Sequence, residues 1–150
     1  MTTNFVIHLE NGITLKGELY NSSAPFTVQN FINLVRRGFY NGLTFHKVIK
    51  NGYVQTGCPK GDGTGNAGYF IKCEFGDYAK QKHEAGVLSM AHCGRNTGSS
   101  QFFICMDRRI THEFDDNHTC FGIVKLGLQF LDDIKVGDVI SHIEIYDVED

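Results

Sequence analysis

The stretch that decides the fold is GSSQFFI at residues 98–104, taken together with FHKVI at residues 45–49 and LSMA at residues 88–91. Each stretch places polar side chains among the aromatic and aliphatic residues that are typical of strands. Phe102 and Phe103 are adjacent on a predicted strand, so their side chains point to opposite faces of the sheet. One of the two rings must therefore lie in the core, which leaves the other for a different surface.

The chain begins with a hairpin pattern. A strand-like run, Phe5-Val6-Ile7-His8-Leu9, is followed by Asn11-Gly12 and then by alternating apolar residues at 13, 15 and 19. An Asn-Gly pair favours positive φ at both central positions of a turn. The sequence therefore predicts a β-hairpin with a two-residue type I′ turn.

A helix is predicted next, from an apolar stripe at helical spacing made of Val28, Phe31, Ile32 and Val35. Pro25 suits the first turn of that helix, where a missing N–H costs nothing. Gly38 suits the position just after the last turn, where a left-handed backbone often ends a helix.

Short strand-like runs fill the rest of the chain, between polar and glycine-rich connections. We predict strands at residues 44–49, 53–56, 69–73, 87–91, 101–105 and 120–124, a last strand near 143–148, and a short helix at 129–134. Many short strands with few helices favour a mainly β fold with a closed or nearly closed antiparallel sheet. No linker or repeat divides the chain, so we expect one domain over residues 1–150.

Composition excludes several classes of function. The net charge is −3 and the pI is near 6.1, whereas a nucleic-acid surface normally shows clustered Lys and Arg. No apolar run approaches the ~20 residues that span a bilayer, and the N-terminus shows no secretory signal pattern. The five cysteines form no CxxC pair, which favours reduced thiols. We therefore expect a cytoplasmic protein that binds neither nucleic acid nor membrane.

Residues 63–68 formally match the GxGxxG pattern of dinucleotide sites. That pattern requires a strand before it and a helix after it, because the helix N-terminus holds the pyrophosphate. Here residues 69–73 follow, and they have a strand pattern instead. We interpret residues 63–68 as a surface loop rather than a nucleotide site.

The signature stretches resemble those of the cyclophilins, a family of peptidyl-prolyl cis–trans isomerases. The family pattern is Phe-His-Arg-x-Ile, then Gln eight residues after the Arg, then Leu-Ser-Met-Ala and Ser-Gln-Phe-Phe-Ile. This chain carries it in the same order, with Lys47 at the Arg position and Gln55 at the Gln position. The resemblance covers nearly the whole chain. It implies an eight-stranded antiparallel closed barrel capped by two α-helices, with a Gly-rich loop at residues 63–68.

The resemblance also implies site residues. Lys47 takes the catalytic position, and Gln55 matches the residue that helps to orient that side chain and the substrate. The implied substrate-binding residues are Tyr53, Ala91, His92, Gln101, Phe103, Glu113, Phe114 and His118. Rotation about an X–Pro bond needs only a donor aimed at the prolyl nitrogen, so no metal or other cofactor is implied. No second His follows His118 at ligand spacing, and we expect no metal there.

Three departures from the family pattern affect the expected activity. Lys47 cannot present the planar fork of an Arg, so we expect catalysis to be reduced. Gly52 stands where the family has a pocket-wall Phe, and the ring of Tyr53 could fill that gap. Glu113 replaces the usual Trp or His, which predicts only weak binding of cyclosporin-like ligands.

Three functions stay open at this point. The first is a monomeric isomerase that acts on Pro-containing peptides and on unfolded or flexible protein segments, assisting their folding. The second is a catalytically weak module that binds Pro-containing segments of a partner protein. The third is a β-barrel that holds a small apolar ligand, against which the polar residues Lys47, Gln55 and Gln101 argue.

Overall fold

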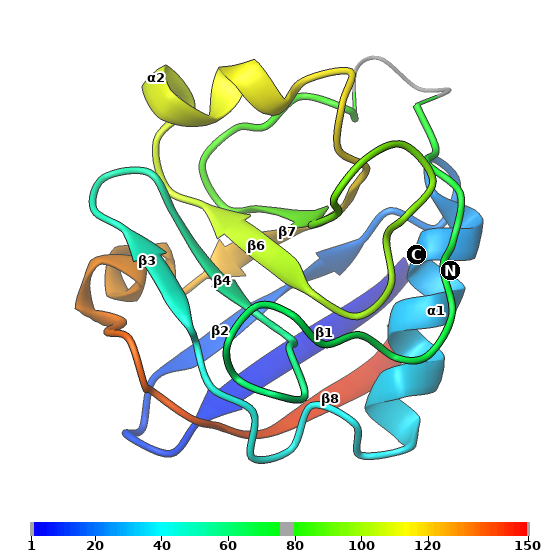
Figure 1. The fold of residues 1–150 in the computed structure, drawn as a ribbon. Helices are drawn as coiled ribbons and strands as arrows, with labels where there is room; N and C mark the ends of the chain where they lie inside the picture. The colour runs from blue at the N-terminus through cyan, green and yellow to red at the C-terminus, as the bar shows by residue number, and fades with distance from the viewer. Residues whose placement is uncertain (1, 76–79, 150) are drawn as a thin grey trace.

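A single curled antiparallel sheet forms the body of the computed structural model, which describes residues 2–75 and 80–149 (Figure 1). Its eight strands lie in the order β3-β4-β6-β5-β7-β2-β1-β8. Their bounds are β1 Thr2–Leu9, β2 Thr14–Leu19, β3 Lys47–Ile49, β4 Tyr53–Thr56, β5 Val87–Met90, β6 Phe102–Cys105, β7 Cys120–Leu126 and β8 Ile140–Val148. The mainly β, eight-stranded prediction is confirmed.

The predicted hairpin is β1–β2, but its turn differs from the expectation. The amide of Gly12 donates to the carbonyl of Leu9, and the amide of Leu9 donates to the carbonyl of Ile13. The backbone φ is positive at Gly12 (96°) but not at Asn11. The connection is therefore a three-residue loop with a left-handed glycine, rather than a type I′ turn.

The first helix, α1 (Pro25–Arg36), is confirmed and packs its apolar stripe into the core. Its first turn has no side-chain cap from the preceding residue. Instead the Glu74 carboxylate accepts hydrogen bonds from the amides of Phe26 (3.3 Å) and Thr27 (2.7 Å). A distant carboxylate thus satisfies two free amides and complements the positive end of the helix dipole.

The main core lies between α1 and the inner face of the sheet. Phe31 of α1 packs edge-on against Phe102 of β6, with 5.5 Å between ring centroids, and also contacts Phe121 of β7 at 5.3 Å. All three rings are fully buried. Phe102 therefore takes the core side of β6, and Phe103 packs into a second, smaller apolar cluster on the other side.

The barrel is not closed by strand pairing, so the predicted closed barrel is corrected to a nearly closed one. Strands β3 and β8 form the two edges of the sheet and do not pair. Between these edges, the part of the chain that the structure describes makes one β-bridge, Thr44 with Val139. The amide of Phe45 also donates to the Asp138 carbonyl at 2.9 Å. Two irregular segments thus join the edges.

Other predicted elements also differ. Residues 69–73 form no strand, and only Ile71 makes a β-bridge, with Gly98. The predicted helix at 129–134 is the 3₁₀ helix η2 (Leu128–Asp133). The structure also has a short α-helix that the sequence pattern did not show, α2 (Arg108–Thr111), which is followed directly by the 3₁₀ helix η1 (His112–Phe114). None of the helices described here is long and apolar enough to cross a membrane.

Candidate active site

Lys47, Gln55 and Phe103 lie in one row across three neighbouring strands. Lys47 of β3 is the register partner of Gln55 on β4, and Gln55 is the partner of Phe103 on β6. Tyr53 lies two residues before Gln55 on β4, so both side chains point to the same face. The sheet therefore brings these four sequence-predicted site residues together.

An aromatic cluster forms where this row meets the segment after η1; it consists of Tyr53, Phe103, Phe114 and His118. The centroid of Phe103 is 5.2 Å from that of Tyr53, 5.1 Å from Phe114 and 5.4 Å from His118. These neighbours leave the Phe103 side chain only 2% exposed. The other rings of the cluster therefore cover most of Phe103.

The side chain of Lys47 extends over this cluster. Its Nζ lies 5.4 Å from the centroid of the Tyr53 ring, within the range of a cation–π contact. Lys47 is exposed, whereas the ring beneath it is half-buried. A hydrogen-bond donor thus stands at the solvent side of an aromatic surface.

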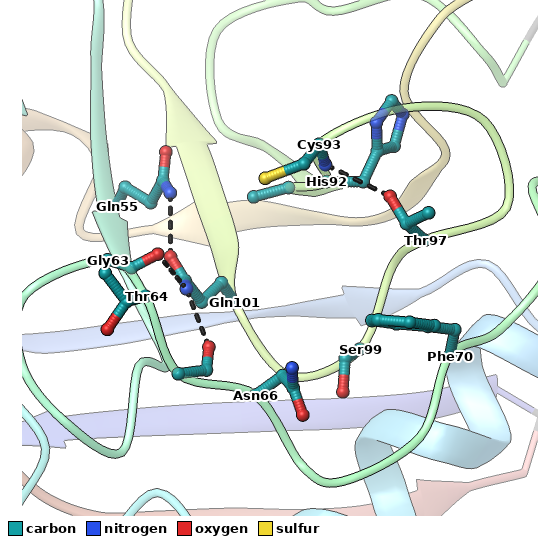
Figure 2. A pocket seen from close by; sticks show the side chains of 12 residues that line it. Gln55, Gly63, Thr64, Asn66, Phe70, His92, Cys93, Thr97, Ser99 and Gln101 are labelled. Carbon is teal, nitrogen blue, oxygen red and sulfur yellow. Dashed lines mark hydrogen bonds between the residues drawn. The ribbon is translucent and has the colours of Figure 1, made fainter.

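Gln101 connects the row to the glycine-rich loop. Its side-chain oxygen accepts a hydrogen bond from Gln55 Nε2 at 3.1 Å (Figure 2). Its Nε2 donates to the carbonyls of Gly63 and Gly65, both at 2.9 Å. The predicted loop at residues 63–68 is therefore tied to the site through one amide side chain.

A pocket of about 270 Å³ opens beside this amide bridge (Figure 2). It is lined by Gln55, Gly63, Thr64, Gly65, Asn66, Phe70, Ala91, His92, Cys93, Thr97, Ser99 and Gln101. The loop residues and the segment after β5 form opposite walls. This pocket and the aromatic cluster are adjacent, since Gln55 borders the pocket and is the register partner of Phe103.

A pair of histidines connects the pocket, which His92 lines, to the aromatic cluster, which includes His118. The rings of His92 and His118 are stacked, with centroids 4.1 Å apart. His118 Nδ1 donates to the Met90 carbonyl at 2.9 Å, which leaves its Nε2 as an acceptor. Burial lowers the pKa of His118 to about 4, so the ring is neutral at pH 7. This arrangement gives the site an uncharged histidine beside Phe103.

Behind Phe103 lies a buried polar network that the sequence patterns did not reveal. The ring of His83 stacks on Phe103 with centroids 5.9 Å apart. His83 Nδ1 is 2.9 Å from Asp115 Oδ1, and Nε2 is 2.7 Å from the Ser89 hydroxyl. Arg108 binds the other Asp115 oxygen at 2.7 Å. Only Ser89 belonged to a recognised motif, and nothing in the local spacing marks His83.

The charges in this network follow from burial and hydrogen bonding. Desolvation lowers the pKa of His83, although Asp115 opposes that shift. Burial alone would raise the pKa of Asp115, but hydrogen bonds from Arg108 and His83 lower it to about 2. A neutral imidazole bonded to a carboxylate therefore backs the aromatic cluster.

Comparison with known proteins gives the family. The model described as "Cyclophilin type peptidyl-prolyl cis-trans isomerase/CLD" matches residues 4–149. The chain belongs to the cyclophilin family. The cyclophilin resemblance predicted from the signature stretches is confirmed.

Individual cyclophilins resemble the chain over most of its length. It is 46% identical to peptidyl-prolyl cis-trans isomerase B of Bacillus subtilis (strain 168), over 97% of this chain and 99% of that protein. It is 44% identical to a peptidyl-prolyl cis-trans isomerase of Synechococcus elongatus, over 95% of this chain and 96% of that protein. A crystal structure of a Cryptosporidium parvum cyclophilin type peptidyl-prolyl cis-trans isomerase superimposes with a TM-score of 0.87 at 30% identity, covering 99% of this chain and 100% of that chain.

One departure of this cyclophilin from the family pattern has a visible structural counterpart. A Cβ added to Gly52 would lie 3.0 Å from Ile49 Cγ2 and 3.2 Å from Ile110 Cγ2, so position 52 has little room for a side chain. The neighbouring Tyr53 ring instead packs on Phe103 and Phe114. Tyr53 therefore supplies an aromatic wall from the next position along β4.

The remaining predicted residues lie at the edges of the cyclophilin site. Glu113 is exposed on η1, one residue before Phe114, and takes no part in the ring contacts of the aromatic cluster. Ala91 follows β5 directly, and its amide already donates to the Gln101 carbonyl at 3.0 Å. The structure thus places Ala91 in the pocket wall and Glu113 on the outer rim.

Proposed function

We propose that this cyclophilin accelerates cis–trans rotation about X–Pro bonds, with Lys47 as the donor to the prolyl nitrogen. The barrier to rotation is ~18–20 kcal/mol because the C–N bond has double-bond character. A hydrogen bond to the nitrogen lone pair removes part of that resonance and stabilises the twisted state. The observation that supports the proposal is the position of Lys47 Nζ, 5.4 Å above the ring of Tyr53 and next to the aromatic cluster.

The other site residues would bind and orient the substrate. Tyr53, Phe114 and His118 offer apolar surface to a proline ring, and the buried Phe103 supports these three rings. Gln55 and Gln101 offer amide groups to the backbone on either side of it. Interactions that strengthen only when the bond is twisted lower the barrier, so no nucleophile or cofactor takes part in this proposal.

The substrates we propose are Pro-containing peptides and the unfolded or flexible segments of other proteins. A crystal structure of the Cryptosporidium parvum cyclophilin in the presence of the dipeptide Ala-Pro superimposes on this chain with a TM-score of 0.85 at 30% identity. That dipeptide carries the chemical group the aromatic cluster would accept. We further propose that the protein acts as a cytoplasmic monomer of one domain that assists slow proline steps in folding.

Two features predict a modest rate and poor inhibition. A Lys ammonium is a single flexible donor, so it cannot contact a carbonyl and the prolyl nitrogen in one plane as Arg can. Lys47 is also exposed, and water competes with the substrate for its donors. Glu113 on the rim adds a charge that an apolar cyclic peptide must desolvate, so we propose that cyclosporin-like ligands bind only weakly.

A second candidate function follows from the coverage of Phe103. Because that ring is 2% exposed, a peptide would lie on the cluster and in the adjacent pocket without being twisted. The protein would then be a module that binds Pro-containing segments of a partner. Both functions would use the same lining residues at the same place. The two functions differ in how fast the bound X–Pro bond rotates.

An exchange measurement separates the two functions. A short Ala-Pro peptide is titrated with the protein, and magnetisation exchange between its cis and trans signals is followed by NMR. The isomerase is supported if exchange exceeds the rate in buffer and scales with protein concentration. Saturable binding with exchange at the buffer rate would establish the binding module. If the folded protein shows neither binding nor faster exchange, both proposed functions are wrong.

A further inference from the structure

A second cluster of chemically active side chains lies on the β1–β8 pair, away from the isomerase site. His8 on β1 is the direct register partner of His142 on β8, and Glu144 lies two residues further along β8. Ile7 and Leu9 on either side of His8 are buried, so His8 itself points outward. These strands stand at the opposite end of the sheet order from β3 and β4 (Figure 1).

The three side chains converge closely enough to share one ligand. Their ligand atoms all lie within 4.8 Å of one another. Glu144 Oε1 is 2.7 Å from His8 Nε2 and 3.5 Å from His142 Nε2. The two imidazole rings are stacked with centroids 4.4 Å apart, and both Nε2 atoms lie within 3.5 Å of the same Glu144 oxygen.

A β-bulge beside the cluster orients one of the rings. His8 pairs with His142, but Leu9 pairs with Ile140, so Ser141 is the extra residue on β8. The Ser141 hydroxyl lies 3.0 Å from His142 Nδ1. If the hydroxyl accepts the Nδ1 proton, the lone pair of His142 is on Nε2 and faces Glu144. Bonds of this kind to the second nitrogen are what fix the tautomer of metal-bound histidines.

We propose that His8, His142 and Glu144 form a binding site for one divalent ion of borderline softness, such as Zn²⁺ or Ni²⁺. Two imidazole nitrogens and a carboxylate oxygen are a common protein ligand set for Zn²⁺, and water completes the tetrahedron. The metal-free structure has a hydrogen bond between His8 Nε2 and Glu144 Oε1. On binding, the ion would replace this bond, with the neutral His8 ring carrying its one proton on Nδ1 and ligating through Nε2.

The site joins the first and last strands of the chain. The ion would link β1 to β8 at the bulge, where the regular ladder is interrupted. His8 and Glu144 are far apart in the unfolded chain, so the ion would bind only the folded state. Such binding raises the stability of the fold by mass action. The expected consequence is a higher Tm in the presence of Zn²⁺, with no requirement for the ion at the isomerase site.

The full chain, freed of metal with a chelator, is titrated with zinc chloride by calorimetry. We expect one saturable equivalent, weakened at least tenfold in His8→Ala and in His142→Ala, and about tenfold in Ser141→Ala, since such outer partners matter for affinity. The matched control is His112→Ala, an exposed histidine outside the cluster, which should bind as the parent does. The Tm rise should disappear in the same variants that lose affinity.

Two results would overturn the proposal. One is a chain that shows no saturable equivalent of Zn²⁺. The other is binding that survives His8→Ala and is lost in Cys93→Ser, which would place the ion on an exposed thiol. Co²⁺ distinguishes these cases independently, because a thiolate ligand gives a charge-transfer band and an imidazole–carboxylate set does not. Circular dichroism of each variant confirms that the fold is retained.

Discussion

The imidazole of His83 lies almost parallel to the ring of Phe103, with 5.9 Å between centroids and 16° between planes. His83 is fully buried, and both of its nitrogens have partners. Phe103, which contacts the other rings of the aromatic cluster, thus stacks on a histidine that is held by hydrogen bonds to Asp115 and Ser89. The position of Phe103 therefore depends on a polar network inside the sheet as well as on apolar packing.

Replacing His83 by Ala should be strongly destabilising. The change leaves a cavity behind Phe103 and removes a partner from both Asp115 and Ser89. We expect the free energy of unfolding to fall by about 2–4 kcal/mol, from the cavity and the unpaired groups together. Urea unfolding measures it, and the surface control His112→Ala should change stability by less than about 0.5 kcal/mol. Equal effects in the two variants would contradict the structural role of His83.

Lys47→Ala should lower kcat/KM for an Ala-Pro peptide by about 10–100-fold, the loss expected for one hydrogen bond from a charged donor. Lys47→Arg should preserve or raise kcat/KM, because the planar guanidinium can contact two acceptors. The protease-coupled assay measures both. The control is Lys50→Ala, an exposed lysine in the β3–β4 turn. Unchanged turnover in Lys47→Ala would show that the donor has been assigned to the wrong residue.

Tyr53 should act through its ring rather than its hydroxyl. The ring contacts Phe103 and Phe114 and lies beneath Lys47 Nζ. We therefore expect Tyr53→Phe to keep kcat/KM within about threefold, whereas Tyr53→Ala should lower it by about tenfold or more, because the substrate proline loses one apolar wall of its site. Steady-state kinetics test this pair of variants. A larger loss in Tyr53→Phe than in Tyr53→Ala would refute the packing role.

Stability should fall as the pH drops from 6.5 towards 4. The pKa of His118 is lowered by burial to about 4 in the folded state, against 6.5 for a free histidine. In this range the unfolded chain binds a proton that the folded chain does not, so the free energy of unfolding rises with pH. The full effect is up to about 3 kcal/mol.

Urea unfolding at several pH values measures that slope. His118→Gln removes the titrating group and should flatten the dependence between pH 6.5 and 4, apart from the share due to His83, whose pKa burial also lowers. A further loss of stability is expected below pH 4. There the unfolded chain protonates Asp115, whereas the folded chain, in which the Asp115 pKa is about 2, keeps it ionised. A parent protein with no pH dependence from 6.5 to 4 would show that His118 is accessible to protons when folded.

Local sequence was sufficient where a single element determines its own contacts. The 3.6-residue spacing of the apolar side chains predicted α1, and the two-residue alternation placed Phe102 and Phe103 on opposite faces of β6. It was insufficient for residues 69–73, which have strand-like composition. There the amide of Cys73 donates to the Asn96 side chain instead of to a neighbouring strand, and Tyr69 hydrogen-bonds Asn30 of α1.

Short helices were also beyond the local pattern. A four-residue helix such as α2 buries only Thr111, so it shows no apolar stripe. The segment at 128–133 forms i→i+3 rather than i→i+4 bonds, since the amide of Phe130 donates to the Gly127 carbonyl in a 3₁₀ turn.

By itself, the sequence determined most of the strands, the opposite faces of Phe102 and Phe103, the first helix and the family. These follow from periodicity and from motifs that lie within one or two neighbouring strands. Only the tertiary structure decided that the barrel edges meet at Thr44 and Val139, that His83 supports Phe103, and that His8 lies against His142. Such contacts join residues distant in the chain, and no local pattern encodes which distant partner a side chain will meet.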